Sequence, residues 1–165
     1  MPVGRKIDLK DVTFKIKDGG ANTLTVKIGE GNFSYTTARA REYILDRGTL
    51  DDVRDGDETP VDVRFDFVWE YIVSESSGAT PTVEEALENT GAAAVWVSTD
   101  SDACRPYAVD LEILNAPGPS TCGDKETLTF SDFRHESLDH DLRAGTVACS
   151  GKCNITKPTS VRATQ

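Results

Sequence analysis

Val61-Asp-Val-Arg-Phe-Asp-Phe-Val-Trp-Glu-Tyr-Ile72 alternates apolar and polar side chains over its whole length. This alternation is typical of a β-strand with one buried and one polar face. We therefore predict a strand over 61–72, with Trp69 in its buried row. At about 3.3 Å per residue the strand would be roughly 40 Å long. A compact domain of 165 residues does not cover that length, so we expect another molecule to cover one end.

The same period of two recurs along the chain. Alternating residues on both sides of Asp18-Gly-Gly-Ala-Asn22 predict a hairpin over 12–28. Further strands are expected at 33–37, 41–46, 95–97, 107–114, 128–130 and 145–155. Many short strands of this kind indicate an antiparallel β-sandwich or barrel.

One helix is expected, at about residues 82–90. Thr82-Val-Glu-Glu85 is a capping box, in which the Thr82 hydroxyl accepts from the Glu85 amide and Glu85 reaches back. Gly91 is expected to end the helix. The predicted fold class is thus mainly β, with one flanking α-helix. We expect a single domain over 1–165, with an N-terminal arm at 1–10 and a C-terminal tail at 157–165.

The composition is that of an ordinary folded domain with a strong acidic bias. The formal net charge is −10. Residues 51–112 hold sixteen carboxylates against three basic side chains, whereas residues 1–50 carry a net +3. Nucleic-acid binders collect Lys and Arg on one face, so we do not expect this chain to bind DNA tightly. No apolar run approaches the roughly 20 residues of a membrane helix, and the start has no secretory signal, so we expect a soluble protein made in the cytosol.

The sequence gives little support for catalysis. It holds no GxSxG, Walker or HExxH motif and two histidines only. Gly29-Glu-Gly31 precedes a strand rather than a helix, so we interpret it as a turn. His135, His140, Cys149 and Cys153 could supply zinc ligands, but their spacing is not that of a known zinc motif. We expect no enzyme activity, no cofactor and no metal.

The four cysteines leave two alternatives open. In a regular strand Cys149 and Cys153 would lie about 13 Å apart, beyond the roughly 7 Å between the Cα atoms of a disulfide. Bridges from Cys104 and Cys122 to that pair are one alternative. Four reduced thiols, as expected in a cytosol, are the other.

Three stretches, taken in their order, resemble a known family. They are Gly56–Ile72, the Thr82–Leu87 segment followed by Gly91, and the ending Phe130–Asn154. Together they are similar to the major tail tube proteins of long-tailed bacteriophages, over about residues 10–158. That family is related to the inner tubes of contractile tails and of type VI secretion. Cysteines are not general in the family, so here the chain departs from it.

The resemblance implies a structural virion protein rather than an enzyme. Its β-sandwich subunits would form hexameric rings that stack into a tail tube, the conduit for DNA ejection. The implied partners are other copies of the chain, the tape measure protein and the tail terminator and tip proteins, with DNA passing unbound and no membrane. The implied location is the virion tail, assembled in the cytoplasm of the bacterial host.

The resemblance also points to two sets of site residues. The loop at 47–59 would contact neighbouring rings through Thr49, Leu50, Asp51, Asp52, Val53, Arg54 and Asp55. Five carboxylates on polar strand faces are candidates to line the lumen: Asp62, Asp66, Glu70, Asp110 and Glu112. Their repulsion would keep DNA phosphates from binding. An acidic outer surface that maintains solubility is the competing interpretation.

The sequence also permits a function of a different class. The chain could be a secreted β-sandwich module with disulfides that binds Ca²⁺ or another ligand through its clustered carboxylates. The absence of a secretory signal favours the tail tube interpretation.

Overall fold

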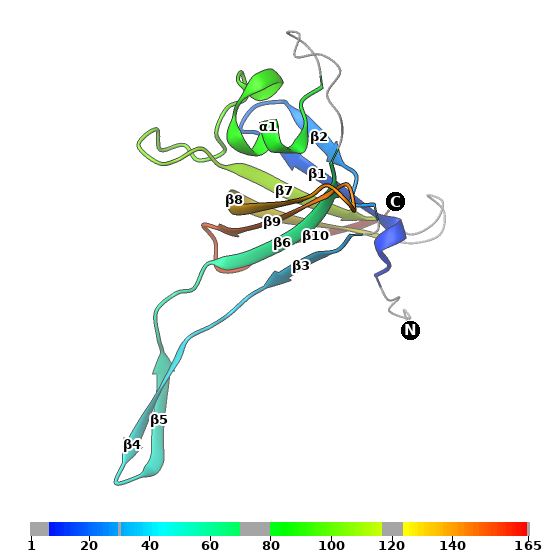
Figure 1. Cartoon of the computed structure of the whole chain (residues 1–165). Helices are drawn as coiled ribbons and strands as arrows, with labels where there is room; N and C mark the ends of the chain where they lie inside the picture. The colour runs from blue at the N-terminus through cyan, green and yellow to red at the C-terminus, as the bar shows by residue number, and fades with distance from the viewer. Residues whose placement is uncertain (1–6, 30, 70–79, 117–123, 165) are drawn as a thin grey trace.

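The computed structural model describes residues 7–29, 31–69, 80–116 and 124–164. Eight antiparallel strands form one sheet, and two further strands form a separate hairpin that projects from it (Figure 1). The mainly β antiparallel fold with one α-helix among the described residues confirms the predicted class. The strands of the large sheet are β1 (Val12–Lys17), β2 (Thr23–Val26), β3 (Phe33–Thr36), β6 (Val61–Val68), β7 (Val109–Asn115), β8 (Asp124–Asp141), β9 (Thr146–Cys153) and β10 (Thr159–Thr164).

The sheet forms two layers because β8 belongs to both. The strand order is β2-β1-β7-β8-β9-β6-β3, and β10 also pairs with β8. The first part of β8, to Phe133, pairs with β7 and β10, whereas the part from Phe133 pairs with β9. We call β2, β1, β7, the first part of β8 and β10 layer A. Layer B consists of β3, β6, β9 and the second part of β8.

Asp132 lies where β8 passes from one layer to the other. Its φ of 56° is in the left-handed region, and the β7–β8 pairing shifts register between Val109 and Leu111. The Asp132 amide donates to Asp110 Oδ1 at 3.1 Å, which satisfies a backbone group that the ladder leaves unpaired. Such a bulge bends the strand, and here it allows one strand to complete both layers.

The hydrophobic core fills the space between the layers. Phe14 of layer A contacts Phe65 of layer B with ring centroids 4.9 Å apart, and Phe33 at 5.1 Å. Phe130 and Phe133 of β8 are at most 1% exposed. Along β6, the four residues in the predicted inward row are buried: Val61, Val63, Phe65 and Phe67. The alternating pattern therefore predicts correctly which face of β6 is buried.

Helix α1 (Val83–Glu88) lies beside β2 (Figure 1). Thr82 caps it as predicted, accepting from the Glu85 amide at 3.3 Å. Glu85 does not reach back, because its carboxylate accepts from the Ala92 amide at 3.1 Å. The helix ends at Asn89, whose φ of 57° allows a left-handed cap. Gly91 instead begins the short 3-10 helix η2 (Gly91–Ala93).

Several predicted strand limits are wrong. The strand that begins at Val61 ends at Val68, and Trp69 is 38% exposed rather than buried in the core. Residues 70–72 lie outside the described residues. The longest strand is instead β8, of which only 128–130 was predicted. Segment 95–97 is not a strand: Val95 and Val97 are exposed while Trp96 between them is buried.

The two ends of the described chain also carry structure. A short 3-10 helix, η1 (Leu9–Asp11), precedes β1 and is capped by Asp8. Strand β10 occupies most of the segment expected to be a tail and pairs with β8 from Thr159↔Thr129 to Thr164↔Asp124. No helix in the described ranges has both the length and the apolar character to cross a membrane.

Candidate functional site

The separate hairpin consists of β4 (Arg41–Asp46) and β5 (Thr49–Asp55). It extends far beyond the layers (Figure 1), and we call residues 41–55 the arm. Arg47 and Gly48 form its turn with φ values of 51° and 82°, the geometry that two-residue hairpins favour. The prediction of a loop at 47–59 is therefore wrong for Thr49–Asp55. This segment is a strand, because the turn at Arg47-Gly48 reverses the chain and lets the segment pair with β4.

The arm has one apolar and one polar face. Directly paired residues share a face, so the pairs Tyr43↔Val53 and Leu45↔Leu50 place four apolar side chains together. Each of the four is more than half exposed: Tyr43 63%, Leu45 58%, Leu50 70% and Val53 51%. We call this set the apolar face of the arm. The described part of the chain does not bury it, and exposed apolar patches of this kind mark interaction sites.

Ion pairs across the two strands support the arm. On the polar face Arg54 donates to both carboxylate oxygens of Glu42, at 2.7 and 2.8 Å, and this contact lowers the pKa of Glu42. Arg41 and Asp55 form a second pair near the base. At the base itself the Gly56 amide donates to the Ala40 carbonyl at 3.0 Å. An isolated two-stranded hairpin is marginally stable in water, so we expect the arm to need a covering partner.

The five lumen candidates do not share one face. Asp62 and Asp66 alternate with the buried row of β6, so they lie on the outer face of layer B. Asp110 and Glu112 belong to β7 in layer A, on the other side of the core. Glu70 lies outside the described residues. The two described pairs therefore lie on opposite outer faces of the chain.

The layer A pair is already engaged within the chain. Asp110 accepts from the Asp132 amide, and its burial raises its pKa. Glu112 forms an ion pair with Lys17 on the neighbouring strand β1. Asp62 lies 3.9 Å from Arg64, a contact between exposed groups that contributes little. Among the described lumen candidates, Asp62 and Asp66 are thus less engaged within the chain than Asp110 and Glu112.

Three of the four cysteines are described, and all three are free thiols. Cys104 is exposed, whereas Cys149 and Cys153 are buried in β9. Burial raises the pKa of both buried thiols to about 12, so they stay protonated and unreactive. Cys122, the fourth candidate for a bridge, lies outside the described residues.

The two histidines are not placed with these thiols to bind zinc. In the described part of the chain no three His, Cys, Asp or Glu side chains form a metal-binding group. His140 Nε2 instead lies 2.8 Å from Glu84 Oε1, and its ring meets Trp69 edge to face at 4.9 Å. These contacts join the end of β8 to α1.

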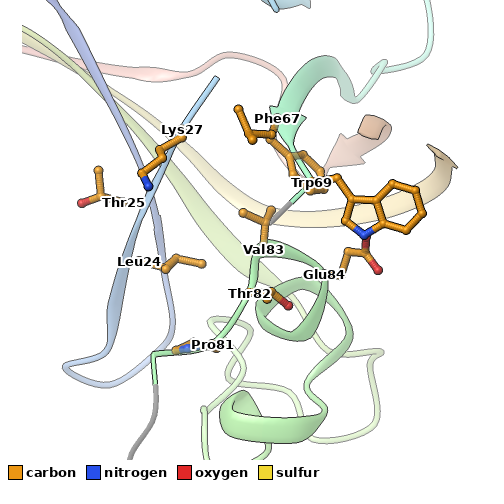
Figure 2. A pocket seen from close by; sticks show the side chains of 10 residues that line it. Leu24, Thr25, Lys27, Phe67, Trp69, Pro81, Thr82, Val83 and Glu84 are labelled. Carbon is orange, nitrogen blue, oxygen red and sulfur yellow. The ribbon is translucent and has the colours of Figure 1, made fainter. Parts of the chain in front are cut away.

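A small pocket lies at this junction, between β2, the end of β6 and α1. Its volume is about 70 Å³. Figure 2 shows Val83 directed between the two strands, with the Trp69 side chain beside Glu84. Ligand pockets for small molecules usually measure about 300–1,000 Å³. This pocket is therefore a packing gap around the helix and not a binding site for a substrate.

The sequence predictions missed half of the arm's apolar face. They included Leu50 and Val53 but not Tyr43 and Leu45, which were expected to belong to a separate strand. The signal was present, because Arg47-Gly48 lies between two runs of alternating residues. A hairpin turn at that dipeptide would have predicted that Tyr43, Leu45, Leu50 and Val53 share one face.

No protein-family model matches the chain. No curated protein matches it either. Among solved structures it is similar to a chain in the six-fold symmetrised cryo-EM structure of the anti-feeding prophage baseplate, with a TM-score of 0.42 and 9% sequence identity. The similarity covers 98% of this chain and 96% of that chain.

Proposed function

We propose that this chain is a structural subunit of a phage tail tube, without enzymatic activity, which assembles with copies of itself through its arm. The observation that carries the proposal is the exposed apolar face of a hairpin that projects from a complete, well-packed core. A monomer gains nothing from such a hairpin, whereas a subunit in a stack of rings buries it against the next copy.

Two further features support the proposal. The motifs in 56–72, 82–91 and 130–154 resemble those of the major tail tube proteins, as described above. The net charge of −10 suits a conduit from which DNA phosphates are repelled. In this proposal the subunits form hexameric rings that stack into a tube, and the tube guides DNA during ejection without binding it.

Removal of the arm tests the proposal. Arg41–Asp55 is replaced by Asn-Gly, since the Gly56 amide and the Ala40 carbonyl already hold the two ends together. Purified wild-type protein should sediment as rings or tubes and appear so by negative-stain electron microscopy. The shortened chain should stay monomeric and keep its melting temperature, because the arm contributes no side chain to the core.

The matched control is Glu42→Gln with Arg54→Gln, which removes the ion pair of the polar face and leaves the apolar face intact. This variant should still assemble. Tubes of normal length from the armless chain, or a wild-type chain that stays monomeric at every concentration tested, would contradict the proposal.

A further inference from the structure

We infer that the apolar face of the arm docks on the outer face of layer A of a second copy. The inference rests on the proposed function, because it names the surface that receives the arm. It starts from a difference between the outer faces of the two layers, which the strand register defines residue by residue.

The outer face of layer A carries a row of two aliphatic and two threonine side chains that crosses four strands. Thr13 of β1 pairs with Leu114 of β7, Leu114 with Thr127 of β8, and Thr127 with Val161 of β10. These residues alternate with inward ones, so their side chains share the outer face. Val161 is 57% exposed. With neighbouring strands about 4.8 Å apart, the row extends over roughly 14 Å.

The arm fits this row in size and in character. Tyr43 and Leu45 lie about 7 Å apart along β4, and their partners on β5 lie about 5 Å across. The apolar face is thus no longer than the row. Two β-surfaces with β-branched and aliphatic side chains pack face to face at about 10 Å, so the ribbon can lie flat on layer A while its polar face remains in water.

Charge favours layer A over layer B. Five carboxylates against three guanidinium groups leave the arm with a net charge of −2. The strands of layer A present three outward lysines against two carboxylates: Lys15, Lys17, Lys125, Asp110 and Glu112. The outer face of layer B presents four carboxylates against three basic groups: Asp62, Asp66, Asp139, Asp141, Arg64, Arg134 and Lys152. Attraction between opposite charges favours layer A as the docking surface, and repulsion between like charges disfavours layer B.

The occupant is a second copy and not the chain's own arm. The arm extends away from the layers in Figure 1, and its apolar side chains are exposed in the single chain. Contact between an arm and layer A of another copy joins two different surfaces. Such a contact repeats from copy to copy and produces rings or filaments, as the proposed tube requires.

Cysteine cross-linking tests the inference. In a Cys104→Ser, Cys122→Ser background, Leu50→Cys is combined with Val161→Cys on layer A. Mild oxidation of the assembled protein should give a ladder of dimers, trimers and larger species on a non-reducing gel. The matched control combines Leu50→Cys with Thr36→Cys, an exposed residue on the outer face of layer B, and should give no ladder.

The outcomes separate this inference from the proposed function. Dimers from Leu50→Cys alone would show that arms pack against each other and would overturn the inference. A ladder with Thr36→Cys would place the arm on layer B. Assembly without any ladder would overturn the docking surface and leave the proposed function standing. As a second measurement, Lys15→Glu with Lys125→Glu should raise the concentration needed for assembly about tenfold; an unchanged concentration would count against layer A.

Discussion

The arm and the two layers are built from the same alternation of apolar and polar residues, yet they differ in what the apolar row meets. In β6 the row meets a second layer, and Phe65 is 2% exposed. In β5 the row meets nothing in the described chain, and Leu50 is 70% exposed. The pattern in a strand therefore identifies a surface to be covered. Whether the cover is another layer or another molecule depends on the tertiary fold.

The largest expected effect is on the core. Phe65→Ala should destabilise the chain by about 3–5 kcal/mol, because it removes a ring that packs on four other buried or half-buried aromatic side chains and leaves a cavity. Chemical denaturation followed by fluorescence measures this loss. A loss below about 1 kcal/mol would show that Phe65 contributes no more to stability than an exposed residue of the arm.

Asp18 is expected to have the next largest effect. Its buried carboxylate accepts from the amides of Gly20, Asn22 and Val97 and from the Asn22 side chain, at 2.7–3.0 Å. Asp18→Ala leaves these donors unsatisfied and should cost about 2 kcal/mol. Thermal unfolding measures the cost. The Val97 contact ties segment 95–98 to the β1–β2 turn, so its loss should also increase hydrogen exchange there.

Asp18 also gives a pH dependence with a definite sign. Burial alone would raise its pKa, but the hydrogen bonds from Asn22, Val97 and Gly20 outweigh burial and lower it. The contribution of Asp18 is therefore full above its unfolded pKa of about 3.9 and is lost as the pH falls through the folded pKa. Asp18→Asn should lose less stability than wild type in this acid range. Parallel losses in the two proteins would contradict this assignment.

Trp69→Ala should have a smaller effect, about 1–2 kcal/mol. The side chain is 38% exposed and contacts His140 at the margin of the core. Arg64→Ala, on the outer face of β6, serves as the control with a melting temperature close to wild type. A loss for Trp69→Ala as large as that for Phe65→Ala would place Trp69 in the core after all.

The smallest effect on folding is expected in the arm. Leu50→Ser should change the stability of the monomer by less than about 0.5 kcal/mol, because the side chain is already in water. Assembly should nevertheless fail, since the change puts a polar group into the proposed interface. Sedimentation and denaturation of the same sample check both statements. A stability loss above 1 kcal/mol would show that the chain itself covers the arm.

The sequence predicted well those elements whose alternation is uninterrupted. The hairpin of β1 and β2 forms as expected, with Phe14 paired to Val26. Of the row predicted to be buried, β6 buries Val61, Val63, Phe65 and Phe67, whereas Trp69 is exposed. Strand β8 was largely missed because two bulges change the phase of its pattern. Phe130 and Phe133 both point inward although only two residues lie between them, where strict alternation would put the two rings on opposite faces. A second register shift occurs between His135 and Ser137. A period of two cannot be followed across such insertions.

For the proposed assembly site, the sequence pointed to a segment that forms half of the arm, but it did not predict the structure of that segment. Thr49–Asp55 was predicted as a loop because it has no core residues of its own, and it is a strand because it pairs with β4. The lumen candidates were chosen because each lies on the polar face of its strand, but the strands that carry them belong to different layers. Which layer a strand joins depends on contacts between residues far apart in the chain, and alternation within one strand holds no information about them.

The sharing of β8 between the layers has a consequence for the order of folding. Strand β1 pairs with β7 nearly a hundred residues later, and layer B closes only when β9 follows β8. Long-range pairings of this kind make folding slow. On the ribosome the arm emerges and can close as a local hairpin well before β8 exists. Each new chain thus exposes the apolar face of the arm before its two layers are complete. In the proposed assembly, slow closure of the layers would delay the moment at which a newly made subunit can join the others.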